Sequence, residues 1–316
     1  MSTVAGAHQV FAEAVERRLE TAVAAHPGTV AAAGAQTLRS GGKRLRPLLV
    51  SMCAVDRSRG DRRLERAGTA VELVHMATLV HDDVLDAAPL RRGHATVWRT
   101  AGREVASATG DYLFARAFAE LADAGDLTAV SLLADACLSL ARGEILQRRQ
   151  AGDPDVTEDE YLRRCRLKTG SLFSAAALLG ARFGGVSDRD AHALAAFAEA
   201  LGLAFQIADD VLDCDGDPDT TGKPLGTDLL DGTVTLPLIL AAGRDREVRA
   251  VIGRGAAPAD VLPTLARVVA TGAVADARTR AHRFAADAAA ELDRVTTPVD
   301  TGALREAVRL ASDRSA

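Results

Sequence analysis

Aromatic residues are scarce in this chain, and its cysteines are few and scattered. Phe, Trp and Tyr together make up 3% of the 316 residues, and alternation of β-branched or aromatic residues with polar ones is nearly absent. We therefore expect few β-strands. The four cysteines form no C-x-x-C pair, which argues against a zinc site or a disulfide framework. We expect a helical protein in a reducing compartment.

The chain also lacks a strong net charge and a long uninterrupted apolar run. Its formal net charge of −5 provides no overall basic field for nucleic acid or an anionic membrane, so a bound anion needs local basic clusters. The apolar stretches 171–185 and 193–208 are short or are interrupted, by Arg182 and Glu199. The first twenty residues carry glutamates among the apolar positions, unlike a signal peptide. These features predict a cytoplasmic protein with no integral membrane association.

Helical periodicity is what the sequence has in abundance. Apolar residues recur every three or four positions in segments rich in Ala, Leu, Arg and Glu, at 11–25, 62–86, 103–121 and 127–147. Turn-forming residues separate these segments, and no internal repeat or low-complexity linker divides the chain. We predict an all-α fold with one domain over residues 1–316, built from roughly ten or more helices of the usual length.

Two acidic segments of identical form each end an apolar helical stretch. Both read D-D-V-L-D, at 82–86 and at 209–213. Positions i and i+4 share a helical face, so the outer carboxylates of each segment lie together and repel each other. Carboxylate oxygens suit Mg²⁺, which usually shares its coordination sphere with substrate phosphates. Solvated acidic helix ends would explain one such segment but hardly two, and neither has the spacing of a calcium-binding EF-hand loop.

Lysine is rare, and every lysine stands in a polar segment that contains glycine. Of the 38 Lys and Arg residues only three are lysines, Lys43, Lys168 and Lys223. Lys meets phosphate as a flexible point charge, whereas Arg offers a planar fork, as the pair Arg91-Arg92 just after the first acidic segment would. The chain has no G-x-S-x-G, Walker A or Rossmann pattern. Carboxylates facing cations, with metal ions between them, suit a diphosphate leaving group.

Seven motifs, in order along most of the chain, resemble those of the trans-isoprenyl diphosphate synthase (polyprenyl synthetase) family. They are G-G-K-R-L-R-P at 41–47, the first acidic segment with R-R-G at 82–93, G-D-Y-L at 110–113, G-E-I-L-Q at 143–147, K-T-G at 168–170, F-Q-x-x-D-D-x-x-D at 205–213 and G-K-P-L-G-T-D-L at 222–229. The resemblance implies an isoprenoid synthase helical bundle around a central cavity. It also implies a homodimer that condenses isopentenyl diphosphate head to tail with an allylic diphosphate, using about three Mg²⁺ ions.

The resemblance also implies a role for each matching residue. Isopentenyl diphosphate is expected on Lys43, Arg46, His75 and Arg92. The allylic diphosphate is expected on Arg91, Lys168, Thr169, Gln206 and Lys223. Of these, Lys168, Thr169 and Gln206 are also the expected catalytic residues, because their dipoles would stabilise the allylic cation. The expected metal residues are Asp82 and Asp86 for two ions and Asp209 for a third, with Asp83, Asp210 and Asp213 in support.

Three further positions bear on activity and product. Thr233 stands where the family commonly has a lysine that faces the allylic substrate. Ala77 and Thr78 occupy positions where bulky residues in the family act as a floor under the growing chain, and here both are small. We therefore predict a product of C20 or longer.

Two other functions are left open. A terpene cyclase shares an acidic helix and the ionisation chemistry, but the duplicated acidic segment and the scarcity of aromatic residues speak against it. A non-catalytic regulatory subunit of a related synthase typically lacks part of the metal-binding set, whereas both acidic segments are complete here. An assay for linear or cyclic products separates all three.

Overall fold

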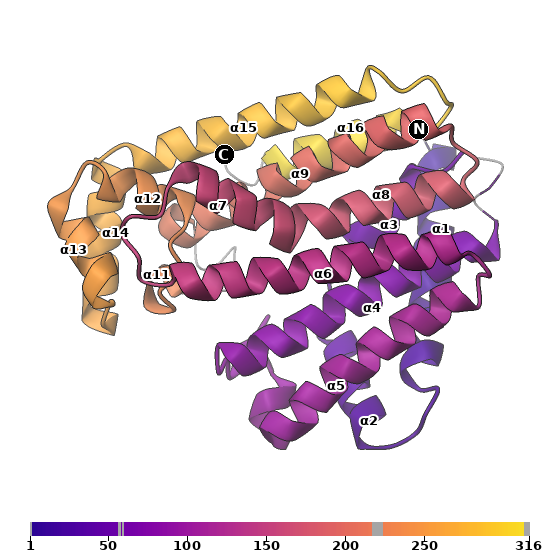
Figure 1. Ribbon diagram of the computed structural model, residues 1–316, viewed down its shortest axis with the longest axis horizontal. Coiled ribbons are helices and arrows are strands. Elements are labelled where there is room, and N and C mark those ends of the chain that lie inside the picture. Colours follow the sequence, from indigo (N-terminus) through magenta and orange to yellow (C-terminus); the bar gives the residue numbers. More distant parts are fainter. Residues whose placement is uncertain (1, 56–57, 59, 217–223, 313–316) are drawn as a thin grey trace. The chain divides into compact units, whose positions relative to one another are not determined.

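Helices account for nearly all regular structure in the part of the chain that is described. The computed structural model describes residues 2–55, 58, 60–216 and 224–312 (Figure 1). Within those residues the only strands are the two-residue β1 (Leu90–Arg91) and β2 (His94–Ala95). The predicted all-α fold class is confirmed. Lys223, predicted to bind the allylic diphosphate, lies outside the described residues.

Residue contacts divide the chain into two compact units. Unit 1 comprises Met1–Cys137, Ser174–Ala195 and Val295–Leu304, and unit 2 comprises Leu138–Phe173, Ala196–Arg294 and Arg305–Ala316. Four helices contribute residues to both units: α6 (Leu127–Gln150), α8 (Ser171–Phe183), α9 (Asp188–Asp215) and α16 (Thr301–Ser312). The single domain over 1–316 and its central cavity stay predictions.

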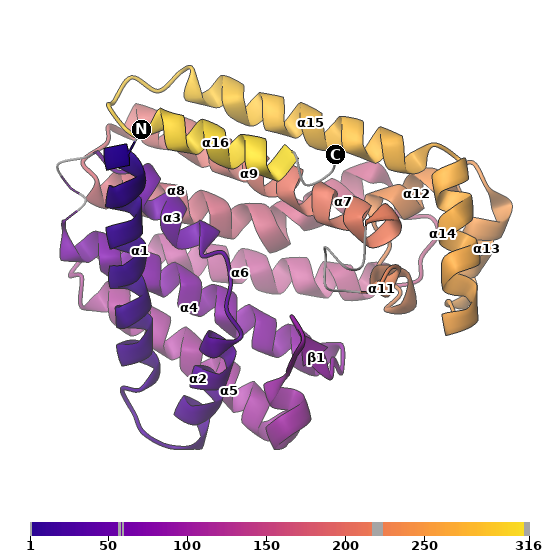
Figure 2. The same cartoon turned by 180° about the vertical axis from the view of Figure 1, so that it is seen from behind.

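The long helix α4 is the central element of unit 1. The helices wholly in this unit are α1 (Ser2–Val23), α2 (Thr29–Arg39), α3 (Leu45–Met52), α4 (Arg62–Leu85) and α5 (Val97–Ala122). α4 packs against α5, α3 and α1, while α2 packs on α5 (Figure 2). The Asp61 carboxylate caps α4 by accepting the backbone N–H of Arg63 at 2.8 Å. Buried residues lie on nearly every side of α4, as expected of a helix surrounded by others.

A tight hairpin follows the end of α4. Strands β1 and β2 pair antiparallel, with Leu90 opposite Ala95 and Arg91 opposite His94. The two residues of the turn, Arg92 and Gly93, both have positive φ, 52° and 78°, as a type I′ hairpin turn requires. The R-R-G sequence therefore forms the hairpin turn, and its two arginines lie at the end of β1 and in the turn itself.

Unit 2 wholly contains most helices of the C-terminal half. They are α7 (Glu158–Cys165), α11 (Thr227–Leu230), α12 (Leu236–Ala242), α13 (Arg246–Arg254), α14 (Val261–Ala270) and α15 (Ala273–Leu292), with a π-helix at Arg166–Gly170 and a 3₁₀-helix at Pro258–Asp260. α12 packs against α7, α13, α14 and α15. A capping box formed by Thr157 and Glu160 starts α7. The apolar core of this unit includes Tyr161, Leu203, Ile207 and Leu236.

Among the described residues, α9 is the one helix whose length and composition would allow it to cross a membrane. Its most apolar stretch is 56% buried inside the protein. Core helices of soluble proteins pass the same test, so this is weak evidence for a span.

Candidate functional site

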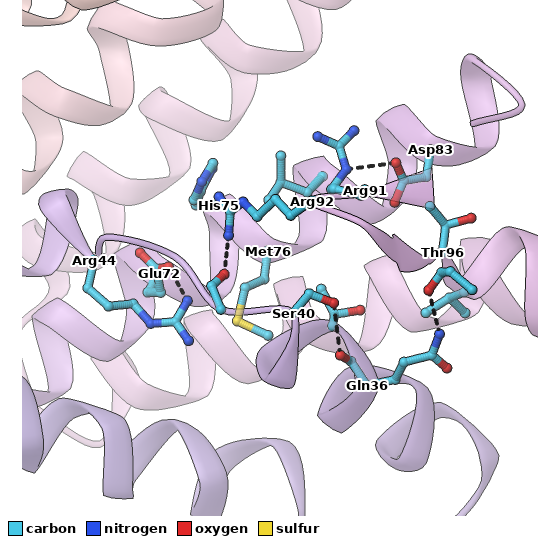
Figure 3. A pocket seen from close by; sticks show the side chains of 15 residues that line it. Gln36, Ser40, Arg44, Glu72, His75, Met76, Asp83, Arg91, Arg92 and Thr96 are labelled. Atoms are coloured by element: carbon cyan, nitrogen blue, oxygen red, sulfur yellow. Dashed lines mark hydrogen bonds and ion pairs between the residues drawn. The ribbon is translucent and has the colours of Figure 1, made fainter. Parts of the chain in front are cut away.

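A basic pocket in unit 1 brings together residues of α2, the 40–44 loop, α4 and the β1–β2 hairpin. Its lining includes Ser40, Arg44, His75, Arg91 and Arg92. Figure 3 shows Arg44 with Glu72 at one side of the pocket and Arg91 with Asp83 at the other. Two predicted isopentenyl diphosphate ligands, His75 and Arg92, therefore line one pocket, and the predicted allylic ligand Arg91 lines it too.

Backbone conformation fixes where two of these arginines stand. Arg44 and Arg92 both have positive φ, 49° and 52°, a region that non-glycine residues rarely adopt. The Arg92 guanidinium donates to the carbonyl oxygen of Gly41, which ties the hairpin to the G-G-K-R-L-R-P segment. Arg44 is the residue that precedes α3. Strained backbone at both arginines must be offset by the contacts that these side chains make.

Arg44 is held by two carboxylates that sequence reasoning missed. Its Nη1 donates to Glu72 Oε1 at 2.9 Å, and its Nε and Nη2 donate to Glu16 at 3.0 and 3.1 Å. Glu72 is only 3% exposed. The signal available in the sequence was one glutamate in the otherwise small and apolar run 67–74 of α4, since a buried carboxylate needs a cation.

The crowding of cations changes the protonation of the pocket. Burial lowers the pKa of His75 well below its usual value, and the positive charges of Arg46, Arg92, Arg91 and Arg44 lower it further. His75 is therefore neutral at pH 7 and has one N–H to donate. Burial likewise lowers the pKa of Arg46 to about 10, which leaves its guanidinium charged at neutral pH.

The first acidic segment lies at the C-terminal end of α4, where its three carboxylates have different surroundings. Asp83 is buried and accepts from Arg91 Nε at 2.7 Å. Burial raises the pKa of Asp83, and Arg91 opposes that shift. Asp82 is half-buried and Asp86 is exposed. Asp83 thus orients the hairpin residue Arg91, and its supporting role at a metal site stays a prediction.

In unit 2 the K-T-G segment is a π-helix that α6 approaches closely. A Cβ on Gly143 would lie 2.8 Å from the backbone nitrogen of Lys168, so the approach requires glycine at this position of α6. The adjacent Glu144 accepts from Lys168 Nζ at 2.5 Å and from Arg148 Nε at 2.8 Å. Gly143 and Glu144, from the G-E-I-L-Q motif, therefore position the predicted catalytic lysine. Single π-helical turns occur often at functional sites.

A chain of hydrogen bonds links the other two predicted catalytic residues to the second acidic segment. Thr169 Oγ1 donates to Gln206 Oε1 at 2.8 Å, and Gln206 Nε2 donates to Asp210 Oδ1 at 2.9 Å. Asp210 Oδ2 in turn accepts from the hydroxyl of Tyr161 at 2.5 Å. Asp210 and Tyr161 are both buried. Burial raises the pKa of Asp210, while the donors Tyr161 and Gln206 oppose that shift.

The remaining carboxylates of the second segment also differ from each other. Asp213 accepts the backbone N–H groups of Thr227 and Asp228, each at 3.1 Å, and so caps α11. Asp209 is exposed. Asp209 is thus the carboxylate of this segment that faces solvent, whereas Asp210 and Asp213 hold protein groups.

Comparison with known proteins identifies the family. The sequence profile of the polyprenyl synthetase family matches residues 28–267. The chain belongs to the polyprenyl synthetase family. It is 37% identical to heptaprenyl diphosphate synthase component 2 of Geobacillus stearothermophilus, over 93% of this chain and 92% of that protein. It is 33% identical to octaprenyl diphosphate synthase of Escherichia coli K12, over 82% of each chain.

Solved structures place this polyprenyl synthetase in the all-α isoprenoid synthase fold. The crystal structure of a decaprenyl diphosphate synthase from Rhodobacter capsulatus superposes with a TM-score of 0.91 at 32% sequence identity, covering 99% of this chain and 98% of that one. The predicted family and fold are both confirmed. The roles of individual residues stay predictions.

The acidic residues of this polyprenyl synthetase suit Mg²⁺ by their chemistry. In the described part of the chain, no three His, Cys, Asp or Glu side chains gather closely enough to hold a metal ion by themselves. Mg²⁺ does not require such a cage, because one or two carboxylates commonly hold it together with substrate phosphates and water. Asp82, Asp86 and Asp209 offer hard oxygen ligands at solvent-accessible positions. The residues present fit a magnesium ion that arrives with a diphosphate.

Four other positions singled out in the sequence lie in the loop before α3, in α4 and in the turn after α11. Lys43 is exposed in the loop before α3. Ala77 is fully buried in α4, and the hydroxyl of Thr78 donates to the carbonyl oxygen of His75 at 2.7 Å. The backbone N–H of Thr233 donates to the carbonyl oxygen of Asp228 at 2.8 Å, in the turn after α11.

Proposed function

We propose that this protein is a Mg²⁺-dependent (E)-prenyltransferase. It condenses isopentenyl diphosphate head to tail with an allylic diphosphate and releases pyrophosphate. Its relatives among the polyprenyl diphosphate synthases support the reaction class. The observation that carries the proposal is the basic pocket of unit 1, in which His75, Arg91 and Arg92 surround a space suited to a phosphorylated ligand, next to the first acidic segment.

Separate groups of residues bind the two diphosphates and the metal ions. Lys43, Arg46, His75 and Arg92 bind the diphosphate of the five-carbon donor. Bound Mg²⁺, held by Asp82, Asp86 and Asp209, would neutralise charge on the allylic diphosphate. Arg91, Lys168 and Lys223 bind that same diphosphate. Asp83, Asp210 and Asp213 support the three carboxylates that bind the metal ions.

Thr169 and Gln206 have the task of stabilising the allylic cation. The Thr169 hydroxyl donates its hydrogen bond to Gln206 Oε1, so the lone pairs of its oxygen are what it can turn toward a positive centre. The C–O bond to diphosphate breaks and leaves the allylic cation, and the donor's double bond then attacks its allylic carbon. The new C–C bond leaves a cation, which loses a proton to the released pyrophosphate. We propose further that the protein acts as a cytoplasmic homodimer, with no nucleic-acid partner and no integral membrane association.

The test is a product assay with the purified chain. The chain is incubated with labelled isopentenyl diphosphate, allylic primers of C5 to C20, and either Mg²⁺ or EDTA, and dephosphorylated products are sized by chromatography. Linear prenyl alcohols formed only with Mg²⁺ are the expected result. Cyclic hydrocarbons would indicate a terpene cyclase. Because one relative is a component of its synthase, absence of product would favour a regulatory subunit over the proposed enzyme.

Product size is the finer part of the proposal. Small residues at Ala77 and Thr78 favour a product of C20 or longer, and the hepta-, octa- and decaprenyl names of the relatives support this. Ala77→Phe should shorten the products. An unchanged product distribution, in a variant that unfolds at the wild-type temperature, would remove Ala77 from the control of chain length.

A further inference from the structure

We propose that Tyr161 is a positioning residue for the Thr169–Gln206 pair, acting through Asp210 to fix which way the Gln206 amide faces. The inference rests on the proposed prenyltransferase function. It concerns a residue that belongs to none of the seven sequence motifs. The observation behind it is the unbroken series of hydrogen bonds from Tyr161 to Asp210, Gln206 and Thr169.

Tyr161 is held rigidly in the core of unit 2. It lies in α7 and is 1% exposed, and its ring contacts the guanidinium of Arg164 at 5.3 Å. Arg164 is itself fixed by hydrogen bonds to Gln150 Oε1 at 2.9 Å and to the carbonyl oxygen of Val234 at 2.7 Å. The Tyr161 hydroxyl is therefore held at 2.5 Å from Asp210 Oδ2, to which it donates, and the Cys165 side chain is also within its reach.

The direction of each hydrogen bond in the series follows from the carboxylate. A carboxylate oxygen that carries no proton only accepts hydrogen bonds, and in the observed geometry Asp210 accepts at both of its oxygens, from Tyr161 at Oδ2 and from the Gln206 amide nitrogen at Oδ1. Gln206 has one end that donates and one that accepts, and turning its NH₂ toward Asp210 leaves Oε1 facing Thr169. Thr169 must then donate its only hydroxyl proton. The polarity of the whole series is set from its buried end.

This polarity gives Thr169 the property that the proposed reaction needs. With its proton engaged by Gln206, the Thr169 oxygen presents electron pairs rather than a proton. A preorganised negative dipole of this kind stabilises a developing cation because it need not reorient during the reaction. If the amide of Gln206 turned over, its NH₂ would face Thr169, and the hydroxyl would be free to direct its proton elsewhere. Tyr161 opposes this by keeping Asp210 in place as an acceptor.

The central experiment compares two Tyr→Phe variants of the full-length chain. Tyr161→Phe removes the hydroxyl and keeps the ring. Tyr112→Phe is the matched control, because Tyr112 is the only other tyrosine and its hydroxyl donates to the carbonyl oxygen of Val23 at 2.8 Å in unit 1. We expect Tyr161→Phe to lower kcat about tenfold or more, the usual effect of losing a hydrogen bond to a charged group, with KM for both diphosphates nearly unchanged. Tyr112→Phe should keep the wild-type kcat.

A double-mutant cycle shows whether Tyr161 acts through Thr169. Thr169→Val removes the hydroxyl at the far end of the series. In that background, Tyr161→Phe should change kcat by less than about twofold, because there is no hydroxyl left to orient. Equal fold-losses in the two backgrounds would show that Tyr161 acts independently, and would overturn the inference.

Failure of the inference can be told apart from failure of the proposed function. A wild-type chain that forms no prenyl product refutes both. Wild-type activity with matching kcat values for the two Tyr→Phe variants refutes only the role of Tyr161. If Tyr161→Phe does not fold, 3-fluorotyrosine incorporated into the Tyr112→Phe chain alters the hydroxyl of Tyr161 alone. A change in kcat of about twofold or more at constant KM then supports the role, and an unchanged kcat overturns it.

Discussion

At the scale of single residues, Glu72 is a buried carboxylate whose negative charge stabilises arginines at the basic pocket. It is 3% exposed and accepts from Arg44 at 2.9 Å, and its charge raises the pKa of Arg46 against the effect of burial. One carboxylate thus faces two arginines that belong to the G-G-K-R-L-R-P motif. Removing one partner of a buried ion pair is costly because the other charge stays buried without compensation.

Glu72→Gln should lower the free energy of unfolding by about 2–3 kcal/mol, since the amide keeps the shape of the side chain and loses its charge. Urea unfolding measures the change. The control is Glu306→Gln, because Glu306 is an exposed residue of α16 that pairs with Arg309, and it should cost less than about 0.5 kcal/mol. Equal effects of the two variants would contradict a special role for the buried pair.

His75 couples the stability of unit 1 to pH. Its pKa in the folded protein lies well below the value of about 6.5 that it has when unfolded. Between these two values the unfolded chain binds a proton that the folded chain does not, so stability rises with pH in this window. The free energy of unfolding should therefore fall as the pH drops below about 6.5.

Part of that pH dependence should disappear in His75→Gln. Unfolding experiments at a series of pH values give the slope directly. His192→Gln is the control, because His192 is exposed on α9 and its ring bonds to the Asp188 carbonyl of its own helix. The slope of this variant should match that of the wild type. A His75→Gln variant with the wild-type slope would show that His75 is not the titrating group.

At the scale of elements, sequence patterns predicted the helices well where local signals were strong. The segment 62–86 was predicted as helical, and α4 runs from Arg62 to Leu85, because Asp61 caps its start and apolar residues fill its length. The helix predicted at 103–121 matches the part of α5 that follows Gly102, whose non-helical backbone (φ 83°) separates it from a first turn that Thr96 caps by accepting the Arg99 N–H. The π-helix at Arg166–Gly170 could not be predicted, because no local pattern marks it, and its close contact with Gly143 of α6 joins residues distant in sequence.

Gly143→Ala tests that contact. The new Cβ would lie 2.8 Å from the Lys168 backbone nitrogen, so α6 or the π-helix must shift. We expect kcat of the proposed reaction to fall by about tenfold or more, because a small displacement of catalytic groups is costly. Thermal unfolding and steady-state kinetics measure the two effects.

The matched control for this substitution is Gly253→Ala in α13. There the new Cβ would meet only Pro154, at 3.6 Å, an ordinary contact. Alanine should therefore leave kcat unchanged and raise stability slightly, by at most about 1 kcal/mol. If Gly143→Ala kept the wild-type kcat as well, the close approach of α6 would have no bearing on the reaction.

At the scale of the whole molecule, the two acidic segments show what sequence could and could not predict. Their identical spacing indicates metal binding at both, although α4 already ends at Leu85 while α9 continues to Asp215. Long-range hydrogen bonds distinguish the carboxylates further. Asp210 accepts from Tyr161, which is 49 positions away, and Asp213 accepts from the backbone at Thr227, 14 positions away. Partners of this kind are set by folding, so residue spacing alone could not separate the six carboxylates. The division into three metal ligands and three supporting residues came from the family resemblance instead.

If the proposed mechanism holds, carboxylates of both acidic segments serve one bound ligand. Mg²⁺ with inorganic pyrophosphate should stabilise the chain against unfolding by about 2.7 kcal/mol when the ligand is at 100 times its Kd, and EDTA should reverse this. Asp82→Asn and Asp209→Asn should each remove most of the stabilisation, whereas Asp293→Asn, at an exposed ion pair with Arg305, should remove none.

The double variant decides between one shared ligand and two separate ones. If both carboxylates hold the same metal-bound diphosphate, either substitution already forfeits its binding, and combining them loses little more than one alone. If each segment binds its own ligand, each single variant keeps about half of the stabilisation, and the losses add. Additive losses would contradict the proposed mechanism even if the chain were active, because that mechanism needs metal ions from both segments on a single leaving group.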